Sequence, residues 1–136
     1  MATVLRAELS EKSKYYVEKH RYYELKHFCL QYPEWKKRYL EMDGFGRTGT
    51  DEIRTNTPGD PTSKCVDMRL ALLKRLRLIE HTAMDADPDL AEYILMAVTE
   101  GLSYPVLKAR CDIPCGKDMY YDRYRRFFWL LDNSRG

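Results

Sequence analysis

Apolar residues recur at spacings of three and four along most of the chain, which is the period of an amphipathic helix. The first such run covers residues 9–32 and predicts one long helix. Pro33 removes a backbone donor, so it should end this helix and begin a short second helix over residues 33–43. The pattern therefore predicts an N-terminal helical hairpin over residues 1–43.

The helical period disappears over residues 44–61, a segment rich in Gly, Thr and Pro. Residues of these types favour turns and interrupt regular structure. We expect this segment to be a linker, or a strap that becomes ordered on a partner.

The helical pattern returns strongly in the second half of the chain, which predicts a helical core over residues 62–136. A long helix is expected from residue 62 to residue 86, with an apolar stripe that includes Leu72 to Ile79. Such a stripe can be a core face or the seam of a homodimer, and the sequence leaves both open. Asp87 and Pro88 should start the next helix, over residues 88–100, and Gly101 should end it.

The C-terminal segment predicts two further helices joined by a turn. A two-turn helix is expected over residues 103–112, followed by a turn and then a longer helix that opens at Lys117. A long helix, a short helix and a basic, aromatic helix in close succession are typical of a helix-turn-helix unit. Because no alternation typical of strands occurs, the predicted fold class is all-α: a small multi-helix domain that ends in this trihelical unit.

Charge permits nucleic-acid binding at the C-terminal end without requiring it. The chain has 136 residues and a net charge of +2. Residues 101–136 carry seven Lys/Arg against four Asp/Glu, whereas residues 44–100 carry seven against ten. A basic excess of this size is a modest electrostatic footprint for a DNA-binding protein.

The trihelical unit resembles a known class of regulators. The run from Leu95 through Glu100-Gly101-Leu102-Ser103-Tyr104, and then the run from Ile113 through Tyr120-Tyr121 and Arg125-Arg126-Phe127-Phe128 to Leu131, resembles the fourth region of sigma factors. It is also similar to late-operon regulators of bacteriophages. The segment HFCLQYPEWKKRYLEMDG resembles small prophage-encoded proteins of Gram-positive bacteria.

The resemblance implies a phage protein that binds double-stranded DNA through a helix-turn-helix and regulates transcription or packaging. The residues that stand where such proteins touch bases and phosphates are Lys117, Tyr121, Arg123 and Arg125, and Arg126 joins them as a further basic residue of the same helix. Arg forms bidentate hydrogen bonds with guanine, and Tyr contacts phosphate or a thymine methyl group.

Two other hypotheses come from different classes of function. Asp118 and Asp122 on the same helix repel phosphate, so the chain could instead be an inhibitor that binds a host nucleic-acid-processing protein, for example an anti-CRISPR protein. Its partner-binding residues would be the tyrosine doublets of the first helix, Tyr15, Tyr16, Tyr22 and Tyr23. A third hypothesis is a structural homodimer built on the Leu72–Ile79 stripe.

Metal-binding and catalytic patterns are weak. Cys111 and Cys115 are spaced C-x3-C without a matched second pair, so reduced, partly buried cysteines are favoured over a zinc site. No phosphate-binding loop or hydrolase motif is present, and we expect no enzyme, no metal and no cofactor. The chain has neither an export signal nor an apolar run of about 18 residues, so we expect it in the cytoplasm of the bacterial host.

Overall fold

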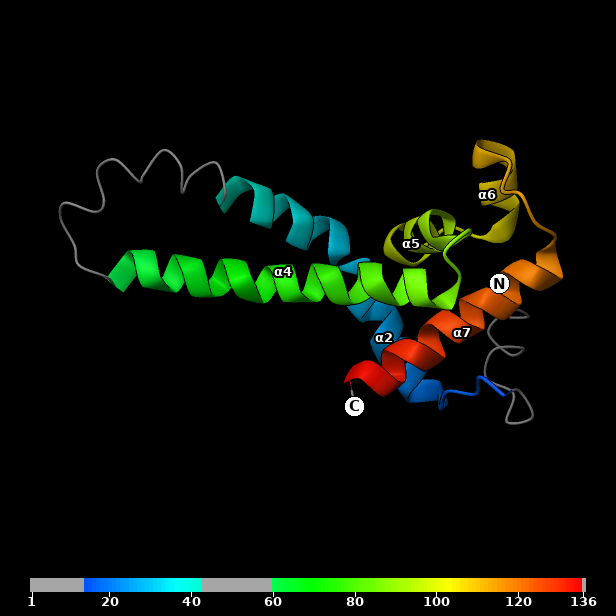
Figure 1. The fold of residues 1–136 in the computed structure, drawn as a ribbon, viewed down its shortest axis with the longest axis horizontal. Helices are drawn as coiled ribbons and strands as arrows, with labels where there is room; N and C mark the ends of the chain where they lie inside the picture. The colour runs from blue at the N-terminus through cyan, green and yellow to red at the C-terminus, as the bar shows by residue number, and fades with distance from the viewer. Residues whose placement is uncertain (1–13, 43–59, 136) are drawn as a thin grey trace. The chain divides into compact units, whose positions relative to one another are not determined.

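The computed structural model describes residues 14–42 and 60–135, and all regular secondary structure in these ranges is helical (Figure 1). The all-α prediction is confirmed for this part of the chain. The labelled helices are α2 (Lys19–Leu30), α4 (Asp60–Ala86), α5 (Ala91–Glu100), α6 (Tyr104–Cys111) and α7 (Lys117–Arg135), and a further helix covers residues 32–42. Residues 44–59 of the predicted linker lie outside the described residues. Its last two residues, Asp60 and Pro61, already belong to α4.

The chain divides into two compact units. One contains residues 1–31 and 78–136, and the other contains residues 32–77. The helix α2 packs on α5 and α7, whereas the helix 32–42 belongs to the other unit. The helix α4 supplies residues to both units.

The first helix begins later than predicted. Residues 14–18 are not helical, and α2 begins at Lys19 instead of near residue 9. Glu18 has an extended backbone, and its carboxylate accepts hydrogen bonds from the backbone N–H groups of His20 and Arg21 at 3.1 and 3.2 Å. This side chain therefore caps the helix and fixes its start. The aromatic and β-branched run before it fits poorly in a helix and buries Tyr15 and Val17 instead.

The start of α5 also differs from the prediction, whereas its end does not. Asp87 does not cap a helix at Pro88; its carboxylate accepts the backbone N–H of Asp89 in a turn, and α5 begins at Ala91. The helix ends at Gly101 as predicted, with φ at +72°. The backbone N–H groups of Gly101 and Leu102 both donate to the carbonyl oxygen of Ala97, which closes the helix end.

Apolar faces from five helices form the core of the first unit. The side chains that are at most 3% exposed include those of Tyr22, Leu25 and Cys29 from α2, Ile79 and Ala83 from α4, Ile94, Ala97 and Val98 from α5, Leu107 from α6, and Tyr120, Phe127, Phe128 and Leu131 from α7. Burial of large apolar side chains stabilises a fold by about 1.5–3 kcal/mol each. The aromatic face of α7 is thus mainly a core face.

The second unit is a helical hairpin made of the helix 32–42 and the first two thirds of α4. Trp35 is buried, and the guanidinium of Arg75 lies 5.2 Å from its ring centroid. The guanidinium of Arg69 lies 4.4 Å from the ring centroid of Tyr39. These cation–π contacts join the two helices.

The apolar stripe of α4 is buried within the chain itself. Leu72, Leu76 and Ile79 are 2%, 4% and 0% exposed. Leu72, Leu76 and Ile79 therefore pack in a core, and a homodimer of this chain stays a prediction.

Candidate nucleic-acid interface

The helices α5, α6 and α7 follow one another through two sharp turns. The first turn is at Gly101, and the second is at Asp112, which has φ at +50° and donates its N–H to the carbonyl oxygen of Lys108 at 3.1 Å. The hydroxyl of Tyr104 donates to the carbonyl oxygen of Cys115 at 2.7 Å, which ties the start of α6 to the segment before α7. The turn is therefore fixed at both ends, and the side chain of Ile113 is buried within it.

A chain of aromatic contacts holds α7 in place. The ring of Tyr120 lies 5.5 Å from Tyr104 and 5.9 Å from Tyr124, and Tyr124 lies 5.1 Å from Phe128. Phe128 in turn meets Tyr22 of α2 edge to face, with the ring centroids 5.0 Å apart. Contacts of this geometry stabilise a fold beyond their burial alone. The orientation of α7 is thus set from α6 at one end and from α2 at the other.

Three of the five predicted DNA-contacting residues share one side of α7. Lys117, Tyr121 and Arg125 are spaced four residues apart, and this spacing places them along one face of a helix. Lys117 is exposed and Arg125 is half-buried. The ring of Tyr121 lies 6.3 Å from that of Tyr104 and 5.0 Å from that of Tyr120, so tilted and edge-to-face ring contacts fix its position.

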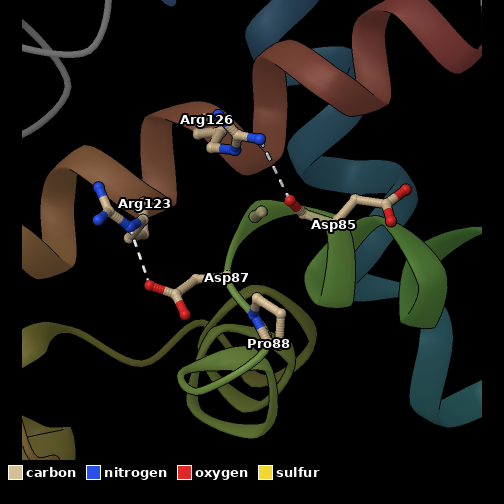
Figure 2. A pocket seen from close by; sticks show the side chains of 6 residues that line it. Asp85, Asp87, Pro88, Arg123 and Arg126 are labelled. Carbon is tan, nitrogen blue, oxygen red and sulfur yellow. Dashed lines mark hydrogen bonds and ion pairs between the residues drawn. The ribbon is translucent and has the colours of Figure 1, made fainter.

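Arg123 points to the other side of α7 and binds the junction between α4 and α5. Its Nε donates to Oδ2 of Asp87 at 2.9 Å (Figure 2). Its Nη1 pairs with the carboxylate of Asp122. The Asp87 side chain is 11% exposed. The hydrogen bond with Asp87, reinforced by Asp122, raises the pKa of Arg123 further above its ordinary value. This arginine therefore holds α7 against α5.

Arg126 makes similar internal contacts. Its Nη1 donates to the hydroxyl of Tyr15 at 3.3 Å, and its Nη2 donates to the carbonyl oxygen of Asp85 at 3.4 Å. Hydrogen bonding from Arg126 lowers the pKa of the Tyr15 hydroxyl below its ordinary value. Arg126 thus joins α7 to the residues before α2 and to the end of α4.

An open cavity of about 370 Å³ lies beside these two arginines. It is lined by Asp85, Ala86, Asp87, Pro88, Arg123 and Arg126, and Figure 2 shows both guanidinium groups directed at the acidic segment. The sequence gives no signal for this pairing, because Asp87 and Arg123 are 36 residues apart. From the sequence alone, the acidic residues before α5, such as Asp85 and Asp87, are interpreted as helix-capping residues.

Comparison with protein-family models, with curated proteins and with solved structures found no match to this chain.

The four predicted partner-binding tyrosines divide into two kinds. Tyr15 and Tyr22 are buried, at 7% and 2% exposed. Tyr16 and Tyr23 are half-buried and remain partly accessible. A partner that docked on this segment would therefore reach Tyr16 and Tyr23 before the other two.

Cys111 and Cys115, the pair that the sequence offers for a zinc site, are free and half-buried. Cys111 Sγ is 3.7 Å from Sδ of Met96, and burial raises the pKa of the Cys115 thiol above its ordinary value, with the nearby Asp87 adding to the shift. Within residues 14–42 and 60–135, no group of three or more His, Cys, Asp or Glu side chains is placed to hold a metal ion. In the same ranges no helix is long and apolar enough to cross a membrane.

Proposed function

We propose that the protein binds double-stranded DNA through α7 and acts as a regulator of transcription or packaging in a phage or prophage. The observation that carries the proposal is the arrangement of α5, α6 and α7. The turns at Gly101 and Asp112 and the aromatic contacts fix α7. The face with Lys117, Tyr121 and Arg125 is at least partly accessible to solvent. This order of helices is the one that helix-turn-helix proteins use to read the major groove.

The proposed contact set is smaller than the set expected from the sequence. Arg125 would contact base edges or phosphates, Lys117 would add attraction to the backbone, and Tyr121 would contact phosphate through its hydroxyl. Arg123 and Arg126 have internal partners, so their proposed part is to orient α7. Asp118 is exposed near the first turn of α7, where it favours the helix dipole but repels phosphate.

The test is selection of preferred duplexes by the full chain from a randomised pool, followed by anisotropy titrations of the selected duplex. Replacement of Arg125 with Ala should weaken binding by about 1–3 kcal/mol and reduce the slope of log K against log salt by about one. The matched control is Arg135→Ala, which removes the same charge from the last turn of the same helix.

Selection of a preferred sequence, together with a larger loss for Arg125→Ala than for Arg135→Ala, supports the proposal. The absence of any preferred sequence, or equal losses for the two variants, contradicts it.

A further inference from the structure

The net positive charge of this protein belongs to the second unit, although the order of the sequence does not indicate it. We define the basic hairpin as residues 32–42 and 64–77, which lie in that unit. These residues hold eight Lys/Arg against three Asp/Glu, and the whole second unit, residues 32–77, holds ten against seven. The described residues of the first unit, 14–31 and 78–135, hold eleven Lys/Arg against twelve Asp/Glu. The unit that contains α7 is thus close to neutral, and the hairpin carries an excess of five positive charges.

Most of these charges point into solvent. Seven of the eight Lys/Arg side chains in the basic hairpin are exposed, and the eighth, Arg69, is half-buried against Tyr39. Lys36, Lys37 and Arg38 are consecutive on one helix, and Lys64, Lys74 and Arg77 are spread along α4. With a rise of about 1.5 Å per residue, the charges on α4 extend over about 20 Å. A DNA duplex presents about one negative charge per 1.7 Å of its axis over that length.

The exposed apolar side chains on the hairpin part of α4 do not all lie on one face. Leu40, Val66, Met68 and Leu70 are 49–56% exposed. Val66 and Leu70 are one helical turn apart, but Met68 lies about half a turn round α4 from both, and Leu40 is on the other helix. Apolar side chains that are exposed singly are normal for a protein surface, whereas docking to a membrane or an apolar groove needs a contiguous apolar face.

We propose that the basic hairpin binds the phosphate backbone of duplex DNA and supplies most of the affinity, independently of sequence. Its Lys and Arg side chains would displace counterions condensed on the duplex, which is the main source of non-specific binding. The inference rests on the proposed function in one respect: α7 would recognise the base sequence of the duplex whose backbone the hairpin binds. The backbone contacts themselves need only the charge of the hairpin.

The experiment compares two double variants of the full chain that change the net charge equally. Lys37→Gln with Lys74→Gln removes one exposed charge from each helix of the hairpin, and Lys19→Gln with Lys26→Gln removes two charges from α2 in the other unit. The probe is a fluorescein-labelled duplex of random sequence, about 20 bp long, titrated at several salt concentrations. Circular dichroism checks that both variants keep the helical content of the wild type.

The hairpin variant should bind about 10- to 100-fold more weakly near 0.1 M salt, and its salt slope should be smaller by about one to two. The α2 variant should bind within about twofold of the wild type. Equal losses for the two variants, or an unchanged affinity of the hairpin variant, would overturn the inference. It would also be overturned if the hairpin variant lost binding only to vesicles of phosphatidylcholine and phosphatidylglycerol.

The failure of this inference and the failure of the proposed function give different results. If a preferred sequence is selected, Arg125→Ala loses more affinity than Arg135→Ala and the hairpin variant binds normally, the inference fails and the function of α7 stands. If the hairpin variant loses affinity while no preferred sequence can be selected, the inference stands and the proposed function fails.

Discussion

At the scale of single residues, the arginines of α7 have two different environments. Arg123 and Arg126 are bound to groups from other parts of the first unit, whereas Arg125 is on the side that carries Lys117 and Tyr121. The sequence shows three arginines within four positions and does not indicate which of them have internal partners. The separation comes from helical geometry, because residues 123 and 126 point about 60° apart and both lie at least 100° away from residue 125.

Replacement of Arg123 with Ala should lower the free energy of unfolding by about 1–2 kcal/mol, because Asp87, 11% exposed, would lose its charged hydrogen-bond donor. Equilibrium unfolding in urea, followed by circular dichroism, measures the change. Arg110→Ala removes an exposed arginine from α6 and should stay within about 0.5 kcal/mol of the wild type. Wild-type stability of the Arg123 variant would show that this ion pair does not hold α7.

The cap of α2 should make part of the stability dependent on pH. Hydrogen bonds from the backbone N–H groups of His20 and Arg21 lower the pKa of Glu18 below its ordinary value. Its contribution is therefore present above the unfolded-state pKa of about 4.3 and is lost as the pH falls through the lower folded-state pKa.

The difference in urea midpoint between the wild type and Glu18→Gln should accordingly shrink as the pH is lowered from about 6 to about 3. The other carboxylates titrate in both proteins, so their contributions cancel in the difference between the two urea midpoints. Midpoint curves that stay parallel over this range would contradict the assigned cap.

At the scale of elements, Gly101 and Asp112, the two residues with positive φ on either side of α6, should give opposite changes in stability when they are replaced. Gly101→Ala places a Cβ at φ of +72° and should destabilise the fold by about 1 kcal/mol. The nearest atom to that Cβ would be Cδ2 of Leu30 at 3.7 Å, an ordinary contact, so the cost comes from the backbone.

Asp112→Gly should be neutral or should stabilise by about 0.5 kcal/mol, because glycine adopts a φ of +50° without strain. It loses only an exposed ion pair with Lys108, with 3.3 Å between Nζ and Oδ1, and such pairs contribute little. Thermal unfolding of both variants measures the effects. Destabilisation by Asp112→Gly as large as that by Gly101→Ala would contradict the strain argument.

The sequence predicted which segments form helices better than it predicted the residues at which those helices begin. The spacing of apolar residues in α4 and α7 gives these elements directly, and Ser103 indicates the start of α6. Pro33 and Gly101 mark the ends of the helices before them. The starts of α2 and α5 were missed. In both places an acidic side chain binds backbone N–H groups at a position that periodicity does not indicate: Glu18 at the start of α2 and Asp87 in the turn before α5.

At the scale of the whole molecule, the distribution of charge follows the folded units and not the order of the sequence. Counting along the chain assigns the largest basic excess to residues 101–136, but the acids of α4 and α5 belong to the same unit and cancel it. The basic hairpin combines two segments that the linker separates in the sequence. Sequence alone could identify α7 as a candidate reading helix, but only the grouping of helices assigns the excess charge to the hairpin.

The most direct test of DNA binding is the anisotropy of a labelled random duplex titrated with the wild-type chain at about 50 mM and about 200 mM salt. We expect saturable binding at the lower salt concentration that weakens at least tenfold at the higher one, because phosphate contacts release counterions. No binding at the lower salt concentration would contradict both the role of α7 and that of the basic hairpin.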